Sequence, residues 1–429
     1  TTQARQTLQD CLAQIHQIPG YETFLTLPTF DNIAATLQAG QPLIYLSHTP
    51  YGSVALVLDQ AANNPDHSVE NKSPVDVTPI WLDDLTNTDL VALFTNANKH
   101  GWFDAYENQG SDRTAWLTAI DSTLQSLWQP IVAPILRHLS QTNCSSVTLI
   151  PTGFYGFLPL HAAWTRDAQG NRRYACDFIE FRYAPNALSL KAASDIAART
   201  PATQLLAIND PQPTDSSPLP GSGEETAKAV SVFPSRGNWK LLQHEAATPT
   251  TVSEALPNYS VAHFSCHGSA NFQTPLNSGL LMAHNEILSL RNLLDLKLAG
   301  LRLAVLSACE TGLPGTDLPD EVISLPTGLL QAGAAGVVSS LWSVSDLSTM
   351  LLISRFYELW RPQDPTIQPL EPPAALHQAQ LWLRDSTGPE LVPYLQNSHP
   401  ELAAKLEQAP DKRPFAHPYY WAAFTYTGV

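Results

Sequence analysis

A cysteine and a histidine, each at the end of an apolar segment, are the residues of this sequence best suited to chemistry. Cys309 ends the run LRLAVLSAC (301–309), and His267 follows the alternating segment SVAHFSC (260–266). A thiol is a strong nucleophile only as the thiolate, and an imidazole within hydrogen-bond reach keeps it reactive. The backbone N–H groups of Gly268 and Cys309 are expected to hold an oxyanion beside the pair. Together these residues predict nucleophilic acyl chemistry.

Cys309 taken alone is equally consistent with a buried core cysteine, because free cysteines are among the most buried residues. The histidine at a second strand end favours the catalytic interpretation. Alternation along a strand puts His263 and His267 on one face and Cys266 on the other. Cys266 is therefore expected to pack in the core, and His263, in mid-strand, to be structural. The same alternation sends Cys266 away from His263, His267 and Cys309, and no carboxylate or histidine pair completes a familiar spacing, so no metal site is expected.

The composition describes a globular chain with a large core, since 44% of its 429 residues are hydrophobic and 14% are charged. A formal net charge of −16 repels phosphate backbones and anionic lipids, so neither nucleic acid nor membrane is an expected partner. Five scattered cysteines without CxxC spacing indicate neither a disulfide framework nor a zinc site. No cofactor is expected, because LPGSGEE (219–225) lacks the P-loop lysine and a GxGxxG pattern. Without a signal peptide or an apolar span, the chain is predicted to be cytoplasmic.

Strand-like and helix-like segments alternate along the chain, which predicts an α/β layered fold with a parallel-rich sheet covered on both faces. In such sheets, ligands and chemistry collect at the carboxyl ends of the strands, where His267 and Cys309 are expected. A loop rich in proline, serine and glycine is expected over 211–224. The predicted strands are 42–48, 53–58, 146–151, 204–210, 260–266, 301–308, 336–342 and 419–428, and the predicted helices include 113–140, 224–233, 321–332 and 346–360.

Four segments together resemble a known family. They are HFSCHG (263–268), LSACETG (306–312), EVISLPTGLLQAGAAGVVSSLWSVSD (321–346) and HPYYWAAF (417–424). These segments are similar to the CHAT domain, the caspase-HetF-associated-with-TPR group of caspase-like cysteine proteases related to separases. In this family the matching residues, here His267 and Cys309, form the catalytic dyad. The resemblance covers nearly the whole chain and implies a caspase-like fold.

The resemblance also implies two halves, an inactive caspase-like scaffold over about residues 1–200 and a catalytic half over about 201–429. In the first half, the strand within VTLIPTGFYG (147–156) ends in Pro151-Thr152-Gly153, where a nucleophile would be needed. Members of the family often carry TPR repeats ahead of this region. The sequence contains no 34-residue repeat.

The function expected from these residues is a cysteine endopeptidase that works through an acyl-enzyme intermediate. An extended peptide substrate is expected to pair, by β-augmentation, with the chain near Ser343 to Ser345, which includes Val344. Trp342 resembles the tryptophan that caspases place beside the cleavage groove, and it is equally consistent with a core residue at a strand end. Activity is expected to depend on a regulatory partner or on a region that precedes Thr1.

Acidic side chains near Cys309 are expected to line the pocket for the residue before the cleaved bond, or else to mark helix starts. Segment 303–350 contains no Lys or Arg, so an acidic substrate residue would find no partner in it. One observation speaks against a basic preference: Met350 is at the position where separase-like proteins have an acidic residue that binds arginine. We therefore expect a basic or neutral residue before the cleaved bond. The acidic candidates are Asp317, Asp320, Glu321 and Asp346.

Two other classes of function stay open at the level of sequence. A caspase-like scaffold would bind partners without cleaving them, and it would have a misaligned dyad. A thiol hydrolase or acyltransferase would act on a small molecule, for which the sequence offers no cofactor loop.

Overall fold

A large mixed sheet forms the centre of the protein. The computed structural model describes residues 2–22, 29–60, 75–95, 101–142, 144–233, 237–269, 271, 274–296, 298, 300–309, 311–313, 324–396 and 398–429. The sheet consists of β1 (Leu43–Thr49), β2 (Gly52–Gln60), β3 (Val75–Leu82), β4 (Ser146–Pro151), β7 (Glu180–Tyr183), β8 (Leu205–Asn209), β9 (Trp239–Gln243), β10 (Val261–Ser265), β14 (Leu303–Ser307), β15 (Gly336–Ser340) and β16 (Phe424–Gly428). β8, β10, β14 and β15 are buried at every residue, as strands covered on both faces are.

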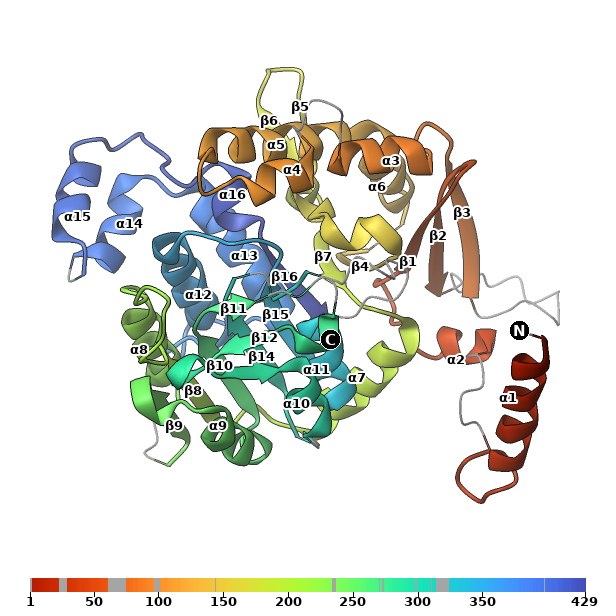
Figure 1. The fold of residues 1–429 in the computed structure, drawn as a ribbon. Coiled ribbons are helices and arrows are strands. Elements are labelled where there is room, and N and C mark those ends of the chain that lie inside the picture. The colour runs from red at the N-terminus through yellow and green to blue at the C-terminus, as the bar shows by residue number, and fades with distance from the viewer. Residues whose placement is uncertain are drawn as a thin grey trace.

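The strands run in two directions. Their order is β3-β2-β1-β4-β7-β16-β15-β14-β10-β8-β9, with β3 and β9 at the edges (Figure 1). β8, β9, β10, β14 and β15 are parallel to one another. β16 is antiparallel to β15 and parallel to β7, which is parallel to β4 and β1. The carboxyl ends of β10 and β14 therefore point to the opposite end of the sheet from those of β1 and β4.

Helices cover both faces, and strand residues alternate between two core clusters. In β14, Leu303 and Val305 belong to the first cluster, whereas Ala304 and Leu306 belong to the second. The first cluster includes residues of α5 (Arg113–Ser126), α6 (Ala133–Leu139), α8 (Ser222–Ser231), α12 (Asp346–Trp360) and α13 (Pro372–Asp385). The second includes residues of α7 (Ala187–Arg199), α9 (Pro249–Ala255), α10 (Leu290–Asp295) and α11 (Leu325–Ala332). A parallel-rich sheet between two helical layers confirms the predicted α/β architecture.

Smaller elements surround this body. Short helices are α2 (Phe30–Ala34), α3 (Asn87–Phe94), α4 (Trp102–Glu107), α14 (Gly388–Leu395), α15 (Pro400–Glu407) and α16 (Pro418–Trp421). Two small sheets contain β5 (Trp164–Arg166) with β6 (Arg172–Tyr174), and β11 (Gly268–Ser269) with β12 (Gly279–Leu281) and β13 (Ile287–Ser289). α1 (Thr2–Ile15) projects from the body and lies below β2 and β3 in the view of Figure 1. Within the described ranges, no helix has the length and apolarity needed to cross a bilayer.

Two predicted elements differ from the structure in detail. The helix expected over 113–140 consists of α5, a π-helical turn (Trp128–Val132) and α6, since Pro130 has no N–H to donate within the helix. The strand expected over 419–428 begins only at Phe424. Its first residues form α16, because Pro418 favours a helix start and the His417 ring accepts a hydrogen bond from a backbone N–H of the first turn.

The proposed boundary near residue 200 falls between α7 and β8. The sheet continues across the two parts of the chain through the pairing of β7 with β16, where Tyr183 lies opposite Thr427. β16 comes from the end of the chain, yet it lies between the strands of the first part and the remaining strands of the second. The division into an inactive and an active half stays a prediction.

Candidate active site

Neighbouring parallel strands bring the predicted histidine and cysteine to one place. In the pairing of β10 with β14, Ser265 lies opposite Ser307. His267 and Cys309 each come two residues later, and between them the N–H of Cys266 still donates to the Ser307 carbonyl (3.4 Å). Both positions keep the alternation of the strand residues that face α8 and α12. The two side chains therefore leave adjacent strand ends toward the same face.

Hydrogen bonds to the next strand fix the turn that carries Cys309. The Thr311 hydroxyl donates to the Ala308 carbonyl (3.2 Å) and accepts from the Ser340 N–H (3.2 Å). The Ser340 hydroxyl donates to the same Ala308 carbonyl (2.8 Å), and the Gly312 N–H donates to the Ser340 carbonyl (2.7 Å). These bonds explain the threonine and glycine of LSACETG. They hold the cysteine at the end of β14 against β15.

Gly268 allows the two strand ends to approach each other. A Cβ at this position would overlap the Cys309 carbonyl oxygen and would lie 3.2 Å from Thr311 Cγ2. Any side chain here would therefore push the backbone that follows His267 away from the cysteine. The glycine of HFSCHG is required by this close approach of two backbones.

A backbone carbonyl orients the imidazole of His267. Its Nε2 lies 2.8 Å from the Ser217 carbonyl oxygen. Because a carbonyl oxygen only accepts, Nε2 carries the proton in this bond and Nδ1 is the basic nitrogen of the neutral ring. Ser217 was not singled out by the sequence, and a main-chain oxygen leaves no signal in residue type. The one sequence feature that includes Ser217 is the loop predicted over 211–224.

Ser343 contacts the thiol. Its hydroxyl donates to Cys309 Sγ (3.3 Å), and its backbone N–H donates to the hydroxyl of Tyr106 (3.3 Å). Ser343 follows β15, in the segment predicted to bind the substrate, and Tyr106 belongs to α4. The first half of the chain therefore reaches the candidate site. Val344, the next predicted residue, is partly buried and packs against the first core cluster.

Trp342 is a core residue in the structure. Its side chain is 0% exposed, and its ring makes edge contacts with Trp102 and Trp116. The indole N–H donates to the Tyr419 carbonyl (3.1 Å). Burial raises the pKa of the Tyr419 phenol; the guanidinium of Arg113 opposes this rise, and the neighbouring Cys309 adds to it. Of the two interpretations of Trp342, this burial favours the core one.

Asp346 is the one predicted acidic residue that the structure describes. It starts α12, and its Oδ2 accepts a hydrogen bond from the N–H of Gly221, 2.6 Å away. Burial raises the pKa of this carboxyl, while the Gly221 N–H and the nearby His399 and His267 oppose the rise. The other three, Asp317, Asp320 and Glu321, lie outside the described residues.

Below the site, three buried polar side chains join β10 to two helices. His263 (0% exposed) lies 3.2 Å from an oxygen of Glu225 (2% exposed) in α8, and these two atoms form no hydrogen bond. Its other ring nitrogen lies 3.2 Å from the hydroxyl of Tyr357 in α12. Burial raises the pKa of the Tyr357 phenol well above its usual value. His263 is thus structural, as its mid-strand position predicted.

Glu225→Gln is expected to lower the free energy of unfolding by about 1–3 kcal/mol, because an amide then replaces the carboxyl group that lies beside His263 in the interior. Denaturant unfolding would measure this change. Glu224→Gln is the matched control, since Glu224 is only partly buried and its bond to the Ser398 hydroxyl survives in the amide. Equal effects of the two changes would mean that the buried pair does not stabilise the fold.

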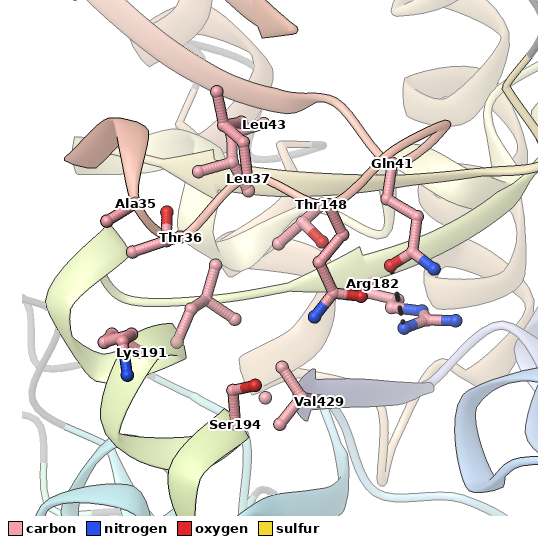
Figure 2. A pocket seen from close by; sticks show the side chains of 13 residues that line it. Ala35, Thr36, Leu37, Gln41, Leu43, Thr148, Arg182, Lys191, Ser194 and Val429 are labelled. Atoms are coloured by element: carbon pink, nitrogen blue, oxygen red, sulfur yellow. Dashed lines mark hydrogen bonds between the residues drawn. The ribbon is translucent and has the colours of Figure 1, made fainter. Parts of the chain in front are cut away.

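A separate cavity of about 180 Å³ is lined by residues of β1, β4, β7, α7 and β16 and by the segment that follows α2 (Figure 2). It is lined by polar groups that include Gln41, Arg182 and Lys191. Arg182 is already bonded to Glu180 (2.7 Å) and to Gln41 (3.3 Å). The lining contains none of the predicted site residues, so this cavity is distinct from the candidate active site.

The fold is similar to that of solved structures, although no curated protein matches the sequence. A chain of the Saccharomyces cerevisiae separase–securin complex aligns with a TM-score of 0.56 at 10% identity, covering 93% of this chain. This chain spans 30% of that one. Gingipain R, an Arg-specific cysteine proteinase, aligns at a TM-score of 0.41 and 12% identity, covering 75% of this chain and 69% of its own. The separase likeness shows that the fold is caspase-like, as the sequence resemblance implied.

The family model of the CHAT domain matches residues 121–429. The matched region begins within α5 and includes every strand from β4 to β16. It contains both strand ends of the candidate site, the Ser217 carbonyl and the Ser343 hydroxyl. The chain belongs to the CHAT-domain family.

Proposed function

We propose that the protein is a cysteine endopeptidase in which His267 and Cys309 form the catalytic dyad. The observation that carries the proposal is the register of β10 with β14, which places the two residues side by side at adjacent strand ends. The Ser217 carbonyl supports it further, because it binds Nε2 and leaves Nδ1 as the base. Membership of the CHAT-domain family and a caspase-like fold agree with this chemistry.

In the proposed reaction, His267 Nδ1 takes the proton of the Cys309 thiol, and the thiolate attacks the carbonyl carbon of the scissile bond. Backbone N–H groups of Gly268 and Cys309 are proposed to hold the resulting oxyanion. The C–N bond then breaks, and the departing amine takes the proton from the imidazolium. Water attacks the thioester with His267 as its base, which releases the carboxylic acid and restores the thiol.

The substrate is proposed to bind as an extended peptide along the segment that follows β15. The Ser343 N–H, which faces the Tyr106 hydroxyl in the structure, would then donate to a substrate carbonyl instead. The pocket for the residue before the cleaved bond is proposed to include Asp317, Asp320 and Glu321. These carboxylates would favour a basic residue and repel an acidic one.

A positional peptide library tests the activity and this preference together. Cleavage is expected after basic or neutral residues, and less than about 1% as fast after Asp or Glu, since an unpaired charge in a pocket costs several kcal/mol. The library has to include acidic residues because a cation from outside segment 303–350 could pair with one. Arg113 of α5 is such a cation, and its guanidinium lies over the Tyr419 ring (4.7 Å). Efficient cleavage after Asp would overturn the assigned preference and leave the protease assignment standing.

Residues 1–200 are proposed to be the inactive half. β1 and β4 are parallel, and Leu46 lies opposite Pro151, so His48 and Gly153 occupy the places that His267 and Cys309 occupy after β10 and β14. A Cβ at Gly153 would overlap the His48 ring, which packs against aromatic neighbours. This half would keep the histidine, lack the nucleophile and serve as a scaffold.

Regulation is proposed to come from a protein partner or from a region outside this chain. The separase neighbour is in a complex with securin, and in this protein Tyr106 already engages the Ser343 N–H that a substrate would use. A partner that draws α4 away would free this donor.

A further inference from the structure

Asp346 lies in a ring of contacts that closes around the candidate dyad. On one side, Ser343 donates to Cys309 Sγ, three residues before Asp346. On the other side, the Ser217 carbonyl binds His267, four residues before Gly221. The hydrogen bond from the Gly221 N–H to Asp346 Oδ2 (2.6 Å) joins the two segments.

This bond links the amino-terminal ends of two long helices. Gly221 is the N-cap of α8, and Asp346 is the first residue of α12, whose own N-cap Ser345 makes no side-chain capping bond. A carboxylate at the start of α8 satisfies an N–H that the helix leaves unpaired and is attracted by the helix dipole. Asp346 therefore caps α8 from α12. Its charge is engaged in a short, charge-assisted bond.

The segment between Ser217 and Gly221 is stiff enough to transmit this restraint. Its sequence is Ser-Pro-Leu-Pro-Gly (217–221), and each proline fixes its own φ and restricts the residue before it. At its end, the Leu219 carbonyl accepts from both the N–H (3.2 Å) and the hydroxyl (2.8 Å) of Ser222. Holding Gly221 in place thus holds the Ser217 carbonyl in place.

The contact between Gly221 and Asp346 leaves little room for a side chain at position 221. A Cβ at position 221 would lie 2.8 Å from Asp346 Oδ2 and 3.2 Å from Met350 Cβ. One turn further along α8, Glu225 lies 3.2 Å from His263 of β10, the strand that precedes His267. The start of α8 is therefore fixed both to α12 and to β10.

We propose that Asp346 is a positioning residue: its carboxylate holds the loop whose Ser217 carbonyl orients His267, and it does not select a basic residue of the substrate. The assignment rests on the proposed function, because it concerns the same dyad. A substrate cation could reach this carboxylate only in competition with the Gly221 N–H. Selection of a basic residue is left to Asp317, Asp320 and Glu321 of the proposed pocket.

Asp346→Asn and Asp346→Ala separate the two roles. Asparagine keeps an oxygen that accepts from Gly221 and removes the charge, whereas alanine removes both. Both variants are measured on peptides with either a basic or a neutral residue before the cleaved bond. The Asn variant is expected to retain kcat within about threefold. The Ala variant is expected to lose about 100-fold in kcat with little change in KM, because a dyad misplaced by about 1 Å costs a factor of this size. Gly221→Ala is expected to act like Asp346→Ala.

Asp364→Ala is the matched control. Asp364 lies in the loop that follows α12 and accepts from a backbone N–H in the same way, at 2.8 Å from Thr366. It should leave kcat unchanged. Loss confined to basic-residue peptides and equal in Asn and Ala would overturn the proposal in favour of a specificity role, and full activity of the Ala variant would overturn it outright.

A second readout does not depend on proteolysis. The rate at which iodoacetamide alkylates Cys309, followed against pH by mass spectrometry, reports the thiolate that a well-placed His267 maintains. The apparent pKa of alkylation should shift more in Asp346→Ala and Gly221→Ala than in Asp346→Asn. This profile tests the positioning role even if no peptide is cleaved, and an unshifted profile in the Ala variant contradicts it.

Discussion

Cys309→Ala should abolish peptide cleavage, reducing kcat by at least about 10⁴-fold, because the variant has no nucleophile to form the thioester. The fold should survive, since the side chain is small and only partly buried, and its loss is expected to cost less than about 1 kcal/mol. Steady-state kinetics on the preferred library peptide and thermal unfolding of the same samples measure both effects.

Cys176→Ala is the matched control for the loss of a thiol. Cys176 is buried in the first half of the chain, and burial raises its pKa to about 12, so this thiol stays protonated and unreactive at neutral pH. Its removal should leave kcat unchanged. Persistent cleavage by Cys309→Ala, or equal losses in the two variants, would contradict the assigned nucleophile.

Gly268→Ala has the second-largest expected effect, a loss of about 100-fold or more in kcat/KM. The added methyl group would occupy the position of the Cys309 carbonyl oxygen, so the two strand ends must separate and the dyad loses its alignment. The same displacement would move the N–H groups proposed to hold the oxyanion. Peptide kinetics and the rate of Cys309 alkylation both report this separation.

The control for this change is Gly110→Ala, because no atom lies within 4 Å of a Cβ built at Gly110. It should leave both measurements unaffected. Wild-type kinetics in Gly268→Ala would show that the close approach of the two backbones is not needed for catalysis.

The strand ends of the candidate site were predictable from the sequence because burial on both faces leaves a strong pattern. β14 is apolar at nearly every position, and the alternation in β10 puts His263 and His267 on one face. The mid-strand position of His263 likewise indicated its structural role. Such signals are local, so a single segment suffices to read them.

The restraints on the dyad left no comparable trace. Ser217 acts through a main-chain oxygen, and the bond between Gly221 and Asp346 joins residues 125 positions apart. Tyr106 reaches Ser343 from another part of the chain. Trp342 kept two interpretations because a strand-end tryptophan has the same local sequence whether it is buried or lines a groove. Only the three-dimensional arrangement distinguishes these cases.

The most direct test of the account is covalent labelling with an electrophilic peptide that carries a basic residue beside its reactive group. Mass spectrometry should locate a single adduct on Cys309. Labelling should be lost in Cys309→Ala and slowed by about 100-fold or more in His267→Ala, while the other four cysteines stay unmodified. Labelling at a different residue, or an unchanged rate in His267→Ala, would contradict the assignment of His267 and Cys309 as the catalytic dyad.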